Sequence, residues 1–228
     1  MIIYGKQASI YALKECSDKI ETVYVSKLSL LPKDLLKKYG AKIKTIENKW
    51  AQKLSRGGNH QGIIVEMQEP QEPSVDSLKK GDFLLILDGL TDVGNIGAII
   101  RSAYALGVDG IFVTGLRQLN LSGVVRASSG AALSMTPVVH NNILDLMNEL
   151  HQVGFSIYGA DLDGSSLQDA SFSNKRVLVL GSEDRGISKR AKEKLDSIYK
   201  IEMSREFDSL NVSAAAAIFL HRMSYAIK

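Results

Sequence analysis

Short apolar runs alternate along the chain with amphipathic stretches, and this alternation continues almost to the last residue. From residue 83 onward the pattern predicts strands and helices in turn. The strands are expected at 83–87, 110–114, 136–140, 155–160, 176–180 and 197–202, and the helices at 95–107, 121–127, 142–152, 188–195 and 211–226. Continuously apolar strands separated by helices are typical of a parallel sheet covered on both faces, so we expect an α/β fold.

The first third of the chain predicts a smaller α/β unit. Helices are expected at 6–16, 32–40 and 48–56, and strands at 22–26, 43–46 and 61–67. The next stretch contains two of the four prolines and several charges, which is typical of a linker. We therefore divide the chain into a domain at 1–67, a linker at 68–82 and a second domain at 83–228.

The charge is unevenly distributed along the chain. Residues 1–80 contain 14 basic and 9 acidic side chains, whereas residues 81–228 contain 14 basic and 16 acidic ones, within a net charge of +3. A basic module beside a nearly neutral one suggests a domain that binds a polyanion, attached to a domain that carries out chemistry. A solvated, lysine-rich face explains the same excess, and composition alone leaves both readings open.

Several classes of protein are disfavoured by what the sequence lacks. The longest apolar runs are too short to span a bilayer, and the first residues do not resemble a secretory signal peptide. The single cysteine, Cys16, forms no intrachain disulfide and suits a reducing compartment, so we expect a cytoplasmic protein with no membrane partner. The histidines show no metal-ligand spacing, and we expect no metal. Glycine fingerprints for dinucleotides and P-loops, and the serine-hydrolase elbow, are also missing.

Three separated stretches, 87–103, 180–188 and 201–217, keep small and polar residues where a core would require bulk. Each runs from an apolar strand through a Gly, Ser or Asn turn towards a helix. Such turns leave backbone amides and helix N-termini available to a ligand. Because the turns follow strands of one predicted sheet, we expect them to share a pocket at one edge.

The first turn contains Asn95 and, further along its helix, Arg101. A guanidinium offers five donors in a fixed fork, which suits a phosphate or a carboxylate. The alternative is that Arg101 braces the turn by pairing with Asp88 or Asp92.

The second and third turns contain Glu183 and the pair Ser209 and Asn211. Glu183 either orients an arginine or a substrate group, or it caps the helix that follows. Ser209 suits the N-cap of the last helix, and Asn211 is a poor helix former, which favours a polar role. The alanines at 214–217 allow close approach of another backbone, either in a helix–helix interface or in a tight internal crossing.

Taken together, DGLTDVGNIGAIIRSAYALGVDGI, LGSEDRGIS and SLNVSAAAAIFLHRM resemble the three signature motifs of the SpoU-type RNA ribose 2′-O-methyltransferases of the SPOUT superfamily. RASSGAALSMTPV, at 126–138, resembles a fourth segment of that family. The stretches IYGKQASIYALKE and SRGGNHQGIIVEM are similar to the small substrate-binding domain, related to a ribosomal-protein fold, of the ribosomal-RNA guanosine branch.

The resemblance implies a parallel sheet whose C-terminal segment forms a trefoil knot, a homodimer formed through the C-terminal domain, and S-adenosylmethionine as cofactor. It implies methylation of a ribose 2′-hydroxyl in RNA, most directly a guanosine of large-subunit ribosomal RNA. The residues that fall on catalytic or substrate-positioning positions are Asn95, Arg101, Glu183, Ser209 and Asn211. Those near the cofactor are Thr114, Gly115, Gly181, Ile201, Met203 and Leu210.

The sequence departs from the family pattern at three places. Val93 and Gly94 stand where Pro-His is usual, Glu202 replaces a proline, and Arg205 replaces a glycine. We interpret these as variation within an active enzyme. Two other functions stay open: a transfer-RNA ribose 2′-O-methyltransferase and an RNA-binding protein without activity. An NAD-dependent oxidoreductase is disfavoured because the glycine fingerprint is missing.

Overall fold

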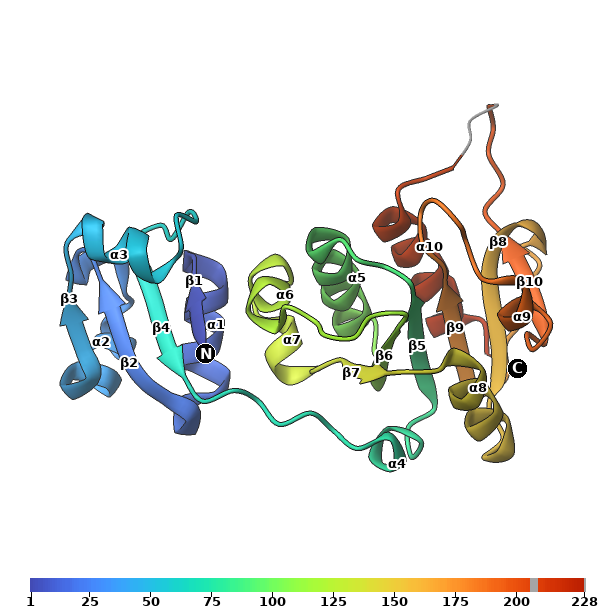
Figure 1. Cartoon of the computed structure of the whole chain (residues 1–228), viewed down its shortest axis with the longest axis horizontal. Helices are drawn as coiled ribbons and strands as arrows, with labels where there is room; N and C mark the ends of the chain where they lie inside the picture. Colours follow the sequence, from blue (N-terminus) through green and yellow to red (C-terminus); the bar gives the residue numbers. More distant parts are fainter. Residues whose placement is uncertain (206–208, 228) are drawn as a thin grey trace. The chain divides into compact units, whose positions relative to one another are not determined.

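The computed structural model describes residues 1–205 and 209–227 (Figure 1). Internal contacts divide the chain into two compact units. Unit 1 consists of Met1–Gln71 together with Asn120–Ser134, and unit 2 consists of Glu72–Leu119 together with Met135–Lys228. The segment Asn120–Ser134, which follows the first strands of unit 2 in sequence, thus contacts mainly the N-terminal residues.

Unit 1 is built on a four-stranded mixed sheet in the order β1-β4-β2-β3, in which only β2 and β3 are parallel. Its elements are β1 (Ile2–Tyr4), α1 (Lys6–Glu15), η1 (Ser17–Lys19), β2 (Ile20–Val25), η2 (Leu28–Leu30), α2 (Lys33–Tyr39), η3 (Gly40–Lys42), β3 (Ile43–Thr45), α3 (Asn48–Leu54), β4 (Ile63–Met67), α6 (Leu121–Ala127) and α7 (Ala131–Ser134). The expected helices and strands of residues 6–67 are present, and β1 is an additional strand. Its three residues are too few to show a period of their own.

Specific contacts attach Asn120–Ser134 to the rest of unit 1. The Arg126 guanidinium lies 4.7 Å from the centroid of the Tyr4 ring and donates a hydrogen bond to the Tyr4 hydroxyl. The hydroxyls of Tyr11 and Ser134 are 2.7 Å apart. In the core of this unit Cys16 is 9% exposed, and burial raises the pKa of its thiol. The cysteine is therefore a packing residue with little thiolate character.

Unit 2 is built on a six-stranded sheet in the order β10-β8-β9-β5-β6-β7. All of its pairings are parallel, which confirms the expected parallel α/β sheet. Its elements are α4 (Val75–Leu78), β5 (Phe83–Asp88), α5 (Val93–Ala105), β6 (Gly110–Thr114), β7 (Val138–His140), α8 (Ile143–Gln152), β8 (Ser156–Ser166), β9 (Arg176–Leu180), α9 (Lys189–Lys192), β10 (Ser197–Lys200) and α10 (Val212–Tyr225).

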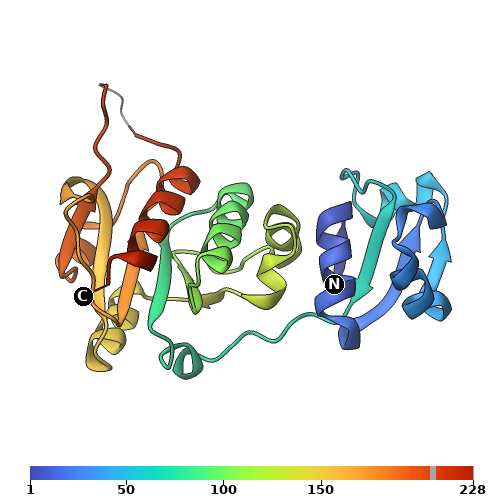
Figure 2. The same cartoon turned by 180° about the vertical axis from the view of Figure 1, so that it is seen from behind.

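Helices cover both faces of this sheet. Leu84 and Ile86 of β5 belong to a buried cluster that includes residues of α8 and Ala191 of α9. On the opposite face α10 packs against α5 and β9, as the front and back views show (Figures 1 and 2). Ala216 is fully buried there. The other alanines of the run are partly buried or, like Ala214, exposed, so Ala216 alone makes this internal contact as a fully buried residue.

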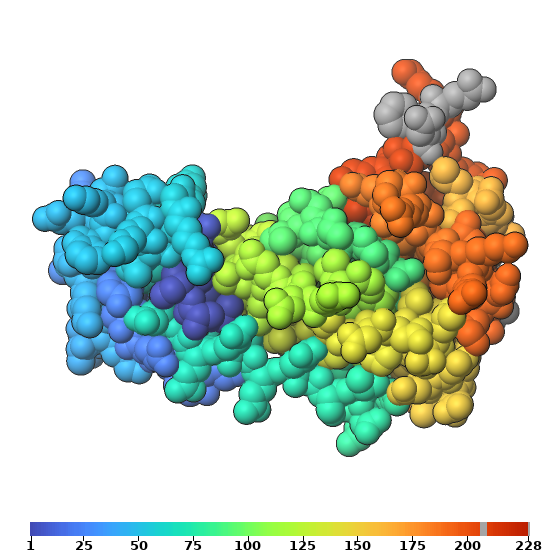
Figure 3. Space-filling model, viewed as in Figure 1, coloured from blue at the N-terminus to red at the C-terminus, as the bar shows by residue number. Residues whose placement is uncertain are grey.

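The segment expected to be a linker, 68–82, lies largely on the surface (Figure 3), and its second half is ordered against unit 2. Helix α4 begins after Ser74, whose Oγ accepts a hydrogen bond from the Ser77 amide at 3.1 Å. The ammonium of Lys79 then lies 2.5 Å from a carboxylate oxygen of Glu149 on α8. Leu78 also packs against the core of unit 2.

The pairing of β8 with β10 is interrupted in the middle. On β10, Ile198 pairs with Gly159 of β8, but the next residue, Tyr199, pairs with Ser165. Residues 160–164 of β8 therefore have no pairing partner on β10 and are skipped in this ladder. A Cβ added at Gly164 would lie 2.6 Å from the Ile198 carbonyl oxygen, which only a glycine avoids. The skipped residues bulge from the ladder at the carboxyl end of the sheet, where ligands bind in open α/β folds.

Candidate active site

The first and second polar turns follow neighbouring strands. Leu87 of β5 pairs with Leu180 of β9, and the chain turns immediately after both. A Cβ added at Gly89 in the first turn would lie 3.7 Å from the Ser182 Cβ in the second. The strand order therefore brings these two turns into contact.

A hydrogen-bonded cluster joins one residue from each of the three turns. The Asn95 side-chain amide donates to Glu183 Oε1 at 3.1 Å. The Asn211 amide donates to the same Glu183 oxygen at 3.2 Å and to Asn95 Oδ1 at 3.1 Å. Two asparagine side chains, 116 positions apart in the sequence, thus converge on a single carboxylate oxygen of Glu183.

Helix caps hold two of these three residues in place. Asp92 caps α5, because its side-chain oxygen accepts a hydrogen bond from the backbone N–H of Asn95 at 2.7 Å. Asn211 caps α10, and its Oδ1 accepts from the Ser213 backbone amide at 2.9 Å and from the Ser213 hydroxyl at 2.5 Å. The expectation that Ser209 caps the last helix is therefore wrong. The helix begins at Val212, too far along the chain for the Ser209 hydroxyl to reach its first amides.

The cap assignment gives a test on stability. We expect Asn211→Ala to lower the free energy of unfolding by about 1 kcal/mol, because the first turn of α10 loses its side-chain acceptor. Ser209→Ala is the matched control and should change it by less than about 0.5 kcal/mol. Urea unfolding followed by circular dichroism measures both. Equal losses in the two variants would contradict the assignment.

The alternative role considered for Glu183, capping the helix that follows, does not occur. Helix α9 begins at Lys189, and its N-cap position is Ser188. Asp88, one of the two aspartates considered as partners of Arg101, accepts a hydrogen bond from the Thr114 hydroxyl at 2.6 Å.

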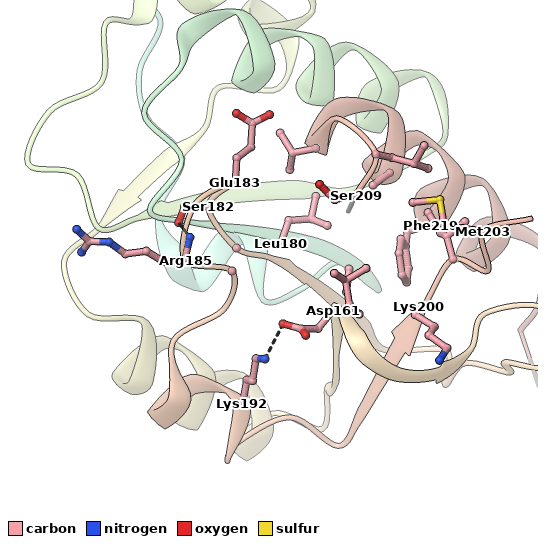
Figure 4. A pocket seen from close by; sticks show the side chains of 18 residues that line it. Asp161, Leu180, Ser182, Glu183, Arg185, Lys192, Lys200, Met203, Ser209 and Phe219 are labelled. Atoms are coloured by element: carbon pink, nitrogen blue, oxygen red, sulfur yellow. Dashed lines mark hydrogen bonds and ion pairs between the residues drawn. The ribbon is translucent and has the colours of Figure 1, made fainter. Parts of the chain in front are cut away.

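Beside the cluster lies a cavity of about 470 Å³, open to one side (Figure 4). This volume lies within the range of small-molecule sites. Apolar residues alternate with a few charged ones in its wall. The lining residues are Ala160, Asp161, Leu162, Leu180, Gly181, Ser182, Glu183, Arg185, Gly186, Lys192, Lys200, Ile201, Met203, Ser209, Leu210, Val212, Ala215 and Phe219.

Six of the eleven residues expected in the site line this cavity: Gly181, Glu183, Ile201, Met203, Ser209 and Leu210. The other five do not line it. Asn95 and Asn211 bond to Glu183. Arg101 is exposed on α5, buried Thr114 ends β6, and Gly115 is exposed in the turn that follows. The cavity therefore gathers the expected residues of the second and third turns, and the cluster connects them to the first.

Residues 82–221 match the SpoU rRNA Methylase family, and residues 2–73 match the family of RNA 2′-O ribose methyltransferase substrate-binding domains. The chain belongs to the SpoU rRNA methylase family. The two matches together span both parts of the sequence that carried the resemblance.

Two curated relatives of this SpoU methylase share more than 30% of its residues over the aligned region. The 23S rRNA (guanosine-2′-O-)-methyltransferase RlmB of Escherichia coli K12 is 31% identical over 232 residues, 96% of each chain. An uncharacterized tRNA/rRNA methyltransferase of Archaeoglobus fulgidus is 37% identical over 149 residues, 65% of this chain and 66% of that one.

Solved structures confirm the fold of this SpoU methylase. The SpoU methyltransferase AviRb of Streptomyces viridochromogenes, in complex with AdoMet, aligns with a TM-score of 0.79 at 24% identity, over 98% of this chain and 89% of that one. A putative RNA methyltransferase of the TrmH family from Porphyromonas gingivalis aligns with a TM-score of 0.73 at 27% identity, over 97% and 88%.

The site of this SpoU methylase also contains residues that the sequence analysis did not single out. Asp161 follows the apolar half of β8, and the Lys192 ammonium of α9 lies 2.7 Å from its carboxylate (Figure 4). Lys200 and Phe219 complete the lining from β10 and α10. The stretch Asp161–Gly164 has the same pattern as the other three turns, with polar residues and a glycine after an apolar strand segment. That pattern could have identified Asp161 from the sequence. Lys192 stands in a lysine-rich helix and gives no such signal.

Among the described residues, 1–205 and 209–227, no group of three or more His, Cys, Asp or Glu side chains is arranged to hold a metal ion. Within the same part of the chain, no helix combines the length and apolar character required to cross a membrane.

Proposed function

We propose that this chain transfers the methyl group of S-adenosylmethionine to a ribose 2′-hydroxyl of RNA, most directly a guanosine of large-subunit ribosomal RNA. The observation that carries the proposal is the Asn95–Glu183–Asn211 cluster beside a ligand-sized cavity. The RNA class is supported by the similarity to RlmB, a 23S rRNA guanosine methyltransferase, over nearly the whole chain. We assign RNA binding to 1–67, a linker to 68–82 and methyl transfer to 83–228.

The cavity fits S-adenosylmethionine in size and chemistry. Leu180, Ile201 and Leu210 supply apolar walls, and Asp161 and Lys192 supply opposite charges. Such a mixture suits a ligand with an aromatic base, a ribose and a zwitterionic amino acid. Gly181, Met203 and the first part of the skipped segment of β8 also line the cavity. We assign Thr114, at the end of β6, and Gly115, in the turn after it, to the border of the cofactor site. When bound, this cofactor supplies an activated methyl group.

The protein's own residues position the nucleotide and stabilise the oxygen that loses a proton. A guanidinium stays protonated at neutral pH and makes a poor base, so we assign Arg101 to the phosphate beside the ribose and to developing alkoxide charge. The Asn95 side chain has a second N–H besides the one bonded to Glu183, and we assign it to the ribose. Asn211, whose amide bonds are made within the cluster and the helix cap, holds Asn95 and Glu183 in position. Ser209 extends this polar wall. Positioning of this kind accounts for on the order of 7–11 kcal/mol of a barrier.

Three finer features complete the proposal. We infer that the C-terminal segment forms a trefoil knot, because β10 lies at the sheet edge while α10, which follows it in sequence, packs against α5 and β9. We infer a homodimer through the C-terminal domain, since α10 and its end expose Ile218, Tyr225 and Ile227. The buried, unpaired Cys16 and an RNA substrate favour the cytoplasm.

The activity is tested directly with purified protein. Calorimetry should show S-adenosylmethionine binding, and radiolabelled cofactor should transfer its methyl group to ribosomal RNA at one ribose position, mapped by resistance to alkaline cleavage. Cofactor binding without transfer to either ribosomal or transfer RNA would contradict the proposal. Transfer to transfer RNA alone would establish the alternative substrate, which is one of the two RNA classes in the name of the Archaeoglobus fulgidus relative. RNA binding without cofactor binding would indicate an inactive RNA-binding protein.

Glu183→Ala tests the cluster itself. The variant removes the acceptor shared by Asn95 and Asn211, so we expect turnover to fall about 10- to 100-fold from misplacement of the ribose. Because the cluster is exposed, the free energy of unfolding should change by only about 1 kcal/mol or less. Glu183→Gln keeps an acceptor oxygen, so its turnover should fall less than that of Glu183→Ala. Glu193→Ala, an exposed residue after α9, is the control, and equal turnover in all variants would contradict the role.

A further inference from the structure

The single tryptophan of the chain, Trp50, lies on the surface of unit 1 with 60% of its side chain exposed. It stands on α3, whose buried contacts are made by Ala51. Tryptophan is usually covered on folding because its ring offers a large apolar area. An exposed position on a short, otherwise polar helix therefore needs an explanation other than core packing.

One basic side chain lies over this ring, and three more stand close to it in the sequence. The Lys53 ammonium lies 5.2 Å from the centroid of the Trp50 ring. From 44 through 56 the chain carries four basic residues, Lys44, Lys49, Lys53 and Arg56, against the single acidic residue Glu47. All four basic residues are exposed. The face thus combines one flat aromatic surface with a net positive charge, which is the combination that binds single-stranded nucleic acid.

Arg56 adds a second, independent observation. It ends the turn after α3 with a φ of 50°, in the left-handed region that a residue with a side chain adopts at a cost. Hydrogen bonds from the Arg56 amide to the Lys53 carbonyl, at 3.2 Å, and from the Gly57 amide to the Gln52 carbonyl, at 2.9 Å, fix this conformation. This turn therefore fixes the backbone of Arg56 directly after α3, and the side chain is exposed.

We propose that Trp50 is the stacking platform for an unpaired base of the RNA substrate, and that Lys49, Lys53 and Arg56 bind the phosphates on either side. The inference rests on the proposed function and names the surface of unit 1 through which the RNA is held. It matches the likeness of residues 2–73 to a substrate-binding domain. Unpaired bases in loops and bulges are the part of RNA that aromatic side chains recognise.

Because Trp50 is the only tryptophan, its fluorescence reports on this one position in the full-length protein. Titration with a single-stranded ten-nucleotide RNA, under excitation selective for tryptophan, should quench the emission as the base stacks. A duplex of the same composition should quench much less. If neither RNA changes the emission, Trp50 does not contact RNA, as expected for a face that binds a protein partner, and the proposal is overturned.

Affinity for the same single strand is measured by fluorescence anisotropy of a labelled RNA. Trp50→Ala should weaken it about tenfold, the scale of one lost base stack, and Trp50→Phe should recover most of the loss. Leu28→Ala is the matched control, since Leu28 is 52% exposed in the same unit and has no assigned role. Equal affinity in the Ala variant and the parent would overturn the proposal.

Two measurements separate this inference from the proposed function. The Trp50 variants should keep full S-adenosylmethionine binding by calorimetry and the melting temperature of the parent, because the ring is exposed and the cavity lies in unit 2. If methyl transfer is absent from the parent but RNA still quenches Trp50, the activity is wrong and the RNA surface stands. If transfer is intact in Trp50→Ala at limiting RNA concentration, the surface is wrong and the activity stands.

Discussion

Replacing Arg101 by alanine is expected to lower methyl-transfer turnover by about 10² to 10³-fold while leaving S-adenosylmethionine affinity unchanged. Arg101 is an exposed residue of α5 and does not line the cavity, so we assign its guanidinium to the nucleotide and not to the cofactor. The size of the effect is that of removing one strong donor to a developing oxyanion. Single-turnover transfer with labelled cofactor gives the rate, and calorimetry gives the affinity.

Two further variants test which property of Arg101 is required. Arg101→Lys keeps the charge but loses the planar fork, so its turnover should fall between those of the parent and the alanine variant. Arg190→Ala removes an exposed arginine of α9 and should behave as the parent. Turnover of Arg101→Ala within about twofold of the parent would remove this residue from the mechanism.

Gly181→Ala is expected to abolish cofactor binding at ordinary concentrations, with an affinity loss of tenfold or more. A Cβ at this position would overlap the carbonyl group of Gly186 and the amide nitrogen of Ile187, which are backbone atoms that move only if the whole turn moves. That turn carries Ser182 and Glu183, so the cavity wall and the hydrogen-bonded cluster would shift together. Overpacking of this kind also lowers stability by about 1–3 kcal/mol.

The control for this substitution is Gly40→Ala. An added Cβ at Gly40 meets nothing within 4 Å, and its φ of −44° suits any residue, so stability and cofactor affinity should be unchanged or slightly raised. Calorimetry and thermal unfolding measure both variants. Normal cofactor binding by Gly181→Ala would show that the turn after β9 does not contribute to the cofactor site.

The fold of unit 2 was largely predictable from sequence because its strands are buried on both sides. Strands β5 and β6 are fully apolar over most of their length, and their predicted bounds agree with the structure to within one residue. Where burial is partial, the predicted ends are wrong in either direction: β10 was expected to reach 202 but ends at Lys200. β8 continues to Ser166 through polar residues, because pairing with β10 and not side-chain hydrophobicity keeps it extended.

The candidate site was predictable where a polar turn interrupts an apolar pattern. Asn95, Glu183 and Asn211 each stand just after a strand or at a helix start, and the order of parallel strands brings such positions to one edge. Sequence could not assign the cap of α10 to Asn211 over Ser209, since both residue types suit that position. It also could not find Lys192, whose role depends on a three-dimensional contact with Asp161.

The skipped segment of β8 contributes to the cavity wall without taking part in the pairing between β8 and β10. Hydrogen bonding to β10 resumes at Ser165 after the gap, so residues 160–164 form an excursion whose length the sheet does not dictate. Insertions or deletions there would remodel one wall of the cavity while the strands on either side keep their register. Selectivity among cofactor analogues can therefore diverge in this lineage through a few positions in one strand, without any change in the scaffold that holds them.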